Sequence, residues 1–320
     1  GYNHLPYPEA HPHSPWSMLE LKRTPETNIF DMIREKDLLI HLPYESFDES
    51  VVNFLYSAAN DKDVLAIKQT LYRVSSSSPV VQALEKAVQN GKQVTVLMEV
   101  KARFDEANNI LMARRLEKAG AHVIYGLVGL KTHSKCTLVI RREKDGIRRY
   151  VHVATGNYNA STAKLYTDLG ILTCSDRFGI DASAFFNLLS GYSDPPIWDS
   201  FIVAPINLRQ RCIELIDREI HFAKNGEDAH MIAKMNSLLD KGIIEKLYEA
   251  SQAGVKIELI VRGICVLIPG IPGVSDNITV RSIVGRFLEH SRIFWFRNGG
   301  REELYISSAD WMPRNLNDRV

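Results

Sequence analysis

The feature that most constrains the fold of this chain is an internal repeat with a long period. Residues 80–100, VVQALEKAVQNGKQVTVLMEV, align without a gap with residues 243–263, IIEKLYEASQAGVKIELIVRG. Each copy has the pattern of an amphipathic helix, then a glycine suited to a helix end, then a β-branched strand. Because one supersecondary unit occurs twice, the sequence predicts two similar halves.

The similarity continues beyond the helix and strand. The first half goes on with AHVIYGLVGLKTHSKCTLVIRR and RRYVHVATGNYN, and the second with ITVRSIVGRFLEHSRIFWFRN and EELYISSADWMPRN. Each half therefore adds a strand, a turn, a His-Ser-basic triplet that opens another strand, and a final strand. The final strands end in polar, asparagine-bearing turns at residues 156–159 and 308–315.

Helices and strands alternate along the whole chain, which favours two α/β domains. We predict a linker, or the tail of a missing N-terminal region, over residues 1–30, a first domain over 31–196 and a second over 197–320. The boundary falls at the turn-rich Ser193–Pro196. A strand and a helix (DLGILTCS, ASAFFNLLSGY) follow Asn159, whereas five residues follow Asn315. By symmetry we expect the second domain to be truncated at its C-terminus.

Composition limits the functional classes. The 320 residues are 45% hydrophobic and 24% charged, which is ordinary for a globular protein, and no apolar run is long enough for a membrane span. The chain shows no signal peptide, and its four cysteines are scattered, so we expect a reduced, cytoplasmic protein. The net charge of +1 means that any site for phosphate must concentrate positive charge in one cleft.

The His-Ser-basic triplets are the candidate chemistry. On a strand, His133 and Lys135 point to the same face, and His290 and Arg292 repeat this arrangement. A pseudo-twofold axis between the halves would bring both pairs into one cleft. A histidine there can attack phosphorus or act as acid and base, while the cations stabilise phosphoryl oxygens. A lone histidine of this kind usually belongs to the core, but its repetition in matched positions favours the site.

A His-x-Lys element followed by a Gly/Ser-x-x-Asn turn, occurring twice, resembles the phospholipase D superfamily. Both copies lack the aspartate that such enzymes carry after this element, since they read HSKCTLVIRR and HSRIFWFRN. Longer stretches resemble bacterial polyphosphate kinase of the histidine-phosphorylating kind: QTLYRVSSSSPVVQAL, EVKARFDEANNI, GLKTHSKCTLVIRR, ATGNYNASTAKLYTDLG, IVRGICVLIPG and FLEHSRIFWF. The resemblance runs from about Lys36 to the end. It implies two phospholipase D-like α/β domains with mixed sheets flanked by helices.

The resemblance also implies roles for individual residues. His133 is the histidine that the γ-phosphate of ATP phosphorylates, and His290 acts across the cleft as acid or base and contacts the nucleotide phosphates. Asp168 could orient His133. The remaining residues of the implied site bind ATP or phosphate: Arg73, Arg103, Lys135, Tyr166, Arg262 and Arg292.

Arginines at strand ends agree with this chemistry. Arg73, Arg103 and Arg262 follow predicted strands, where open α/β sheets place their ligands, and guanidinium groups suit phosphate. The resemblance associates Arg73 and Arg103 with a Mg²⁺ site. A guanidinium cannot ligate a cation, so phosphate must lie between these arginines and the ion, which would bridge phosphate oxygens and keep several waters.

The expected reaction has two steps: His133 takes the γ-phosphoryl group of ATP, and inorganic polyphosphate then accepts it, in a reversible cycle. The resemblance further suggests a homo-oligomer with ATP, ADP and polyphosphate as ligands, no nucleic acid, and peripheral membrane contact as an option. Two alternatives stay open. One is a phosphodiesterase or nuclease of the phospholipase D type. The other is a catalytically incomplete fragment that only binds polyphosphate, because the family's N-terminal adenine-contacting region is absent here.

Two further patterns bear on structure rather than chemistry. His122 and His152 lie on predicted strands and are expected to be structural. Residues 141–149, RREKDGIRR, contain an Asp-Gly pair between basic residues and predict a solvated hairpin.

Overall fold

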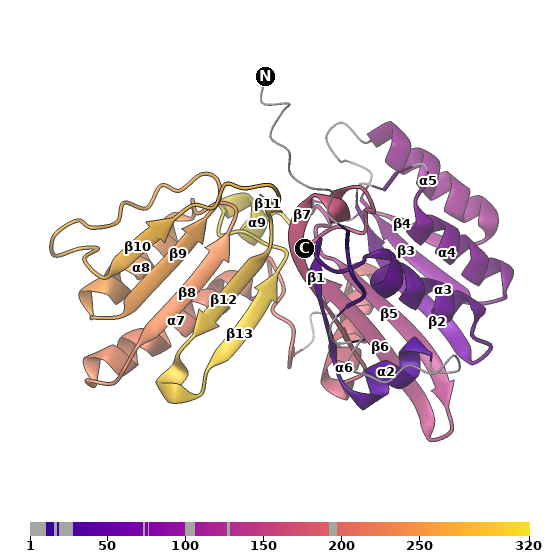
Figure 1. Ribbon diagram of the computed structural model, residues 1–320, viewed down its shortest axis with the longest axis horizontal. Coiled ribbons are helices and arrows are strands. Elements are labelled where there is room, and N and C mark those ends of the chain that lie inside the picture. Colours follow the sequence, from indigo (N-terminus) through magenta and orange to yellow (C-terminus); the bar gives the residue numbers. More distant parts are fainter. Residues whose placement is uncertain are drawn as a thin grey trace.

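The computed structural model describes residues 11–15, 18, 28–72, 74–75, 77–99, 106–126, 129–191 and 197–320. Two α/β units lie side by side, and each is a sheet with helices packed on it (Figure 1). The predicted fold of two domains with mixed sheets flanked by helices is confirmed. The predicted boundary, Ser193–Pro196, lies outside the described residues, so the domain limits stay a prediction.

The first unit contains the elements from α2 to α6. They are α2 (Ile29–Glu35), β1 (Leu38–Leu42), η1 (Asp48–Val52), α3 (Asn53–Asn60), β2 (Val64–Leu71), α4 (Pro79–Gln89), β3 (Gln93–Met98), α5 (Glu106–Ala119), β4 (His122–Tyr125), β5 (Cys136–Glu143), β6 (Gly146–Ala154), η2 (Thr162–Lys164), β7 (Tyr166–Thr173) and α6 (Asp176–Leu189). The strand order in the sheet is β1-β7-β6-β5-β2-β3-β4.

The second unit contains the elements from α7 to α9. They are α7 (Leu208–Lys224), β8 (His230–Met235), α8 (Lys241–Gln252), β9 (Lys256–Val261), β10 (Ile278–Arg281), β11 (Leu288–Glu289), β12 (Arg292–Phe296), η3 (Asn298–Gly300), β13 (Glu303–Ser307) and α9 (Pro313–Asn317). Its strand order is β10-β9-β8-β12-β13, while β11 crosses to the first unit.

The two sheets share one topology. In the first, β4, β3 and β2 run parallel, and β5 and β6 continue antiparallel. In the second, β10, β9 and β8 run parallel, and β12 and β13 continue antiparallel. The predicted repeat of one helix and four strands therefore gains a fifth strand in each half, β2 in the first and β8 in the second. The first sheet has β7 and β1 in addition, beyond β6.

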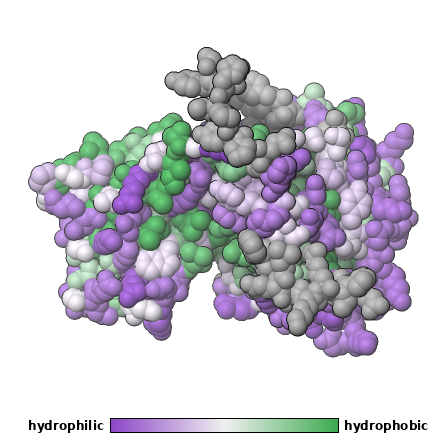
Figure 2. All heavy atoms as spheres, viewed as in Figure 1, coloured by the Kyte–Doolittle hydropathy of each residue, from purple (hydrophilic) through white to green (hydrophobic). Residues whose placement is uncertain are grey.

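Helices cover these sheets as the amphipathic patterns predict. In the first unit α3 packs on α4, as α7 packs on α8 in the second. Each of the repeated helices begins at a side-chain cap: the backbone N–H of Val81 donates to Ser78, and that of Ile243 donates to Asp240. Hydrophilic side chains cover the outer side of the first unit, where α4 and α5 lie (Figures 1 and 2).

Strand β11 joins the two units. Leu288 pairs with Tyr166 of β7, and Glu289 pairs with Thr167, in a parallel ladder. The Thr167 hydroxyl donates to Glu289 Oε2 at 3.1 Å, so a side-chain bond supports the ladder. Because β11 directly precedes His290, this contact places the second triplet beside β7 of the first unit (Figure 1).

Smaller predictions also have outcomes. Residues 141–149 lie in the predicted β5–β6 hairpin, but Glu143 pairs with Gly146, so the two turn residues are Lys144 and Asp145, one position before the predicted Asp-Gly pair. None of the described helices is long and apolar enough to cross a membrane.

Candidate active site

His133 lies in a loop immediately before β5, rather than within the strand as the pattern suggested. Two side chains hold this loop. The Thr70 hydroxyl donates to Ser134 O at 2.9 Å, and Glu99 Oε2 accepts a hydrogen bond from the Thr132 N–H at 2.8 Å. The predicted pairing of the triplet is present, because Lys135 Nζ lies 3.2 Å from His133 Nδ1. His133 Nε2 is the ring nitrogen that points away from this contact.

The second unit supplies a further support that the sequence did not reveal. His133 N–H donates to Val320 O at 2.6 Å, and Ser134 N–H donates to the same oxygen at 2.9 Å. The N–H of Lys131 donates to Asp318 O at 3.0 Å. The backbone of residues 318–320 thus runs beside the His133 loop as a short parallel bridge, so both units fix the position of this histidine.

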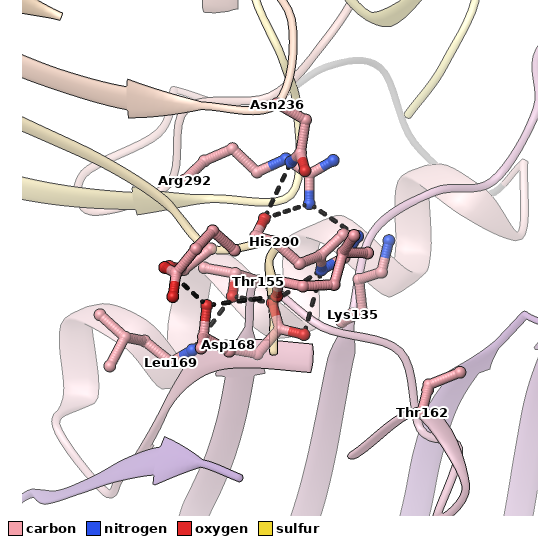
Figure 3. Close-up of polar contacts among 12 residues, drawn as sticks. Lys135, Thr155, Thr162, Asp168, Leu169, Asn236, His290 and Arg292 are labelled. Carbon is pink, nitrogen blue, oxygen red and sulfur yellow. Dashed lines mark hydrogen bonds and ion pairs between the residues drawn. The ribbon is translucent and has the colours of Figure 1, made fainter. Parts of the chain in front are cut away.

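His290 lies between β11 and β12, and Arg292 is the first residue of β12. Arg292 Nη1 lies 3.0 Å from His290 Nε2. A guanidinium can only donate, so Nε2 of a neutral His290 accepts and the ring proton sits on Nδ1. Arg292 also forms a two-bond pair with Asp310, at 3.2 Å and 2.9 Å, and Asp310 itself is buried. Figure 3 shows Arg292 and His290 side by side.

Asp168 overturns one prediction. The sequence predicts that Asp168 orients His133, but its two carboxylate oxygens lie 2.8 Å and 3.0 Å from His290 Nδ1 (Figure 3). Asp168 belongs to β7 of the first unit, so this contact crosses between the units. Thr155 Oγ1 donates to Asp168 Oδ1 at 2.6 Å and fixes the carboxylate. Which histidine Asp168 faces depends on the pairing of β11 with β7. Spacing along the chain could not show this pairing.

Gly156 makes this arrangement of Asp168 possible. A Cβ atom built on Gly156 would lie 2.3 Å from Asp168 Oδ2, far closer than carbon and oxygen can approach. The glycine of the Gly-Asn-Tyr-Asn turn therefore has a steric role beside a site residue. Sequence reasoning identified the turn but attached no role to Gly156.

The two triplets form one electropositive cluster. Burial first, and then the Lys135 ammonium, lower the pKa of His133 well below its ordinary value. Arg319, Arg292 and His290 act on the pKa of His133 in the same direction. Burial, followed by repulsion from Arg292, lowers the pKa of Lys135 well below its ordinary value. The two histidines and two cations are therefore close enough to act on one another's charge, while a shared cleft stays a prediction.

Charge on His290 is balanced differently. Burial lowers the pKa of His290, the hydrogen bond with Asp168 opposes this, and the Arg292 guanidinium lowers it further. The net pKa is below the ordinary value, so a neutral ring is favoured near pH 7. Tyr166 packs against this ring, with ring centroids 5.1 Å apart. Tyr166 therefore lies beside His290, next to the predicted site.

Arg262 stands at the end of β9, as the repeat predicts, and is half-buried. Its Nε donates to Asn236 Oδ1 at 2.7 Å, and Asn236 Nδ2 donates to His290 O at 2.9 Å (Figure 3). A short chain of bonds therefore connects Arg262 to the second triplet. Arg73 and Arg103, the remaining predicted arginines, lie outside the described residues.

A protein-held cage for magnesium is not found in the described parts of the chain. No group of three or more His, Cys, Asp or Glu side chains there could hold a metal ion. Two buried carboxylates near the histidines, Asp168 and Asp310, are already bonded to His290 and Arg292, and a third, Glu99, accepts a hydrogen bond from Thr132 N–H. These residues fit Mg²⁺ poorly as direct ligands.

A cavity of about 290 Å³ lies behind the His133 loop, between the two units. His133, Lys135 and Arg319 contribute to one side of it. Most of the remaining wall is apolar, including Phe185 and Phe294. Because such a wall cannot replace water around a polyanion, this cavity does not suit a phosphate chain.

Comparisons with known proteins come from both sequence and structure. The family model described as polyphosphate kinase C-terminal domain 1 matches residues 28–195, and that described as polyphosphate kinase C-terminal domain 2 matches residues 201–320. Curated polyphosphate kinases from Halalkalibacterium halodurans and Bacillus anthracis are 59% and 56% identical to the whole chain. The chain spans 44% and 45% of their lengths. The crystal structure of the Porphyromonas gingivalis polyphosphate kinase matches 98% of this chain and 47% of its own, at 41% identity and a TM-score of 0.87.

Proposed function

This chain belongs to the polyphosphate kinase family, and from that premise we propose that it carries the centre for reversible transfer of the ATP γ-phosphate to inorganic polyphosphate through a phosphohistidine on His133. The observation that carries the proposal is the meeting of His133, Lys135, His290 and Arg292 at the contact between the units. Such a cluster offers a neutral imidazole surrounded by positive charge, which suits attack on the phosphoanhydride of ATP.

In the first step, His133 Nε2 attacks the γ-phosphorus in line. The N–P bond forms while the bond from phosphorus to the bridging oxygen breaks, and ADP leaves with the electron pair. The lowered pKa of His133 supports this role, because the ring keeps its lone pair at neutral pH. The cations beside it offset the charge on the equatorial oxygens.

In the second step, a terminal oxygen of polyphosphate attacks the same phosphorus. The N–P bond breaks, and the chain is longer by one phosphate. The reverse sequence makes ATP from ADP. His290 can give or take a proton only at Nε2, since its Nδ1 faces Asp168, so Arg292 has to yield that nitrogen to the substrate. Mg²⁺ bound to the nucleotide would neutralise phosphate oxygens, and the side chains named above would not ligate it directly.

The experiment that tests this proposal is labelling with γ-³²P-ATP. We expect acid-labile, base-stable label that disappears in His133→Ala, and slower labelling of the same residue in His290→Ala. Label on another residue, or full labelling of His133→Ala, would refute the assignment. The same measurement on a longer polypeptide that includes the N-terminal part of the relatives tests a second expectation, that this chain binds polyphosphate but turns over ATP poorly.

A further inference from the structure

The shared topology allows single positions of the two halves to be matched. The triplets align His133 with His290 and Lys135 with Arg292. In the first hairpin Cys136 lies opposite Val153, and in the second Ile293 lies opposite Ile306. Val153 therefore matches Ile306, and four residues further on Asn157 matches Asp310.

Other contacts confirm this register. Counting along the parallel strands from their paired residues matches Thr70 with Lys234. The Thr70 hydroxyl donates to Ser134 O at 2.9 Å, and Lys234 Nζ donates to Ser291 O at 3.1 Å. Two different side chains at matched positions thus hold the same carbonyl, that of the middle residue of each triplet.

The matched positions carry different charges. In the second half the Asp310 carboxylate binds Arg292 through two hydrogen bonds. Although burial acts in the opposite direction, this pair holds the pKa of Asp310 below its ordinary value, so the carboxylate stays ionised. In the first half, Asn157 provides a neutral amide, and its Oδ1 is buried without a partner among the described residues.

Lys135 is consequently an unusual cation. Its side chain is 4% exposed, and no ion pair joins it to a carboxylate within the described ranges. Its side-chain hydrogen bonds there go to the ring and the carbonyl oxygen of His133, and its ammonium lies 5.9 Å from the centre of the Tyr72 ring. Asp168 and Asp310 partly offset the lowering of its pKa by burial and by Arg292, and a phosphoryl group on His133 would add further counter-charge.

We propose that this matched position, Asn157 in the first half and Asp310 in the second, determines which of the two histidines takes the phosphoryl group. Asp310 neutralises the cation beside His290, whereas Asn157 leaves the charge of Lys135 available to a phosphate oxygen. The proposal rests on the proposed function, because it assumes phosphoryl transfer to His133. It adds a residue that sets the specificity between the two imidazoles and that does not itself touch phosphorus.

The direct test is Asn157→Asp, which is nearly isosteric and places a carboxylate at the position that Asp310 occupies in the second half. We expect labelling of His133 by ³²P-polyphosphate to slow by about 10- to 100-fold. Asn157→Ser, the neutral control, should stay within about threefold of the wild type. An unchanged rate in Asn157→Asp, with label on His133 of the wild type, would overturn this inference alone. Absence of label from the wild type, together with a lack of label from ATP, would instead refute the proposed function.

A double-mutant cycle shows whether the effect passes through Lys135. In the Lys135→Gln background, Asn157→Asp should cause no further slowing, because the cation that it neutralises is gone. Equal slowing in both backgrounds would contradict the proposal. It would indicate instead that the new carboxylate at position 157 acts through repulsion from Asp168.

The affinity for tripolyphosphate is a second measurement, and it does not require turnover. It can also be made on a second variant besides Asn157→Asp. Measured by calorimetry at fixed ionic strength, the Kd should rise about tenfold in Asn157→Asp and fall by a similar factor in Asp310→Asn, which releases Arg292. Thermal unfolding of each variant checks that it is folded. If Asn157→Asp does not fold, Asp310→Asn still decides, because an unchanged or weaker affinity there would overturn the proposal.

Discussion

The two halves of the molecule present the same His-x-cation pair on the same sheet topology, but the contacts of this pair differ between them. His290 is held on both ring nitrogens, by Asp168 across the contact between the units and by Arg292 of its own half. Among the residues that the structure describes, His133 has one such contact, to Lys135, and its loop is held through the backbone. The two halves thus share one topology, and the charged residues that contact the two histidines differ between them.

The difference separates two uses of positive charge. Arg292 shares a buried ion pair with Asp310, so its loss should be felt mainly in folding. Lys135 stabilises no carboxylate among the described residues, so its loss should be felt mainly in chemistry. Substitution of Lys135 and of Arg292 in turn can therefore test whether the two cations have these different roles.

The largest effects are expected from Lys135→Gln and Arg292→Gln. Lys135→Gln should slow labelling of His133 by about 10²–10³-fold, since it removes charge stabilisation of the phosphoryl oxygens. Its free energy of unfolding should be unchanged or slightly higher, because an uncompensated buried charge is gone. Arg292→Gln should lower the free energy of unfolding by about 3–5 kcal/mol, because Asp310 is left buried and unpaired. Urea unfolding and label incorporation measure both quantities.

A control separates the ion pair from the arginine itself. Arg292→Gln combined with Asp310→Asn removes both charges and should recover most of the lost stability. The comparison between the halves fails if Lys135→Gln is the variant that unfolds, or if Arg292→Gln remains as stable as the wild type.

Asp168→Asn tests the contact between the units, with a smaller effect. An asparagine can donate as well as accept, so it no longer fixes the Nδ1 proton of His290. We expect the labelling rate to fall by about 10- to 100-fold while the label stays on His133. Phosphopeptide mapping and the rate of incorporation give the two readouts.

The double variant Asp168→Asn/His290→Ala decides which histidine Asp168 serves. If the carboxylate acts through His290, the double variant should be as slow as His290→Ala alone. Additional slowing in the double variant would restore the sequence-based expectation that Asp168 orients His133.

Much of this site could be predicted from the sequence because the determining signals are local or repeated. The gapless match between residues 80–100 and 243–263 predicted equivalent helices and strands, and the triplets predicted the pairing of His133 with Lys135. The strand end at Arg262 was also visible, because a change of residue type marks the end of a β-branched run.

Contacts between the halves could not be predicted in the same way. The partner of Asp168 depends on how β11 pairs with β7, which involves only two residues on each strand. The bridge of residues 318–320 to the His133 loop uses backbone atoms, and any residue offers those. The charge difference between Asn157 and Asp310 was present in the sequence, but its meaning required the strand register to match the two positions.

A pH effect on stability is the smallest difference expected between the halves. His152 is buried, its Nδ1 lies 2.8 Å from the Tyr158 hydroxyl, and burial lowers its pKa to about 3. The matched residue of the second half is Tyr305, which is half-buried. Between pH 6.5 and about 3 the unfolded chain binds a proton at His152 that the folded chain does not, so the free energy of unfolding falls as the pH falls.

The expected loss is about 1.4 kcal/mol for each pH unit below 6.5, at most, from this one histidine. His152→Gln keeps a hydrogen-bonding group but cannot titrate, so its free energy of unfolding should depend less on pH by that amount. Urea unfolding of both proteins at pH 7.0, 6.0 and 5.0 measures the slopes. Parallel slopes would mean that the folded chain accepts the proton at His152 as readily as the unfolded one, and that the structural role predicted for this histidine does not require the neutral ring.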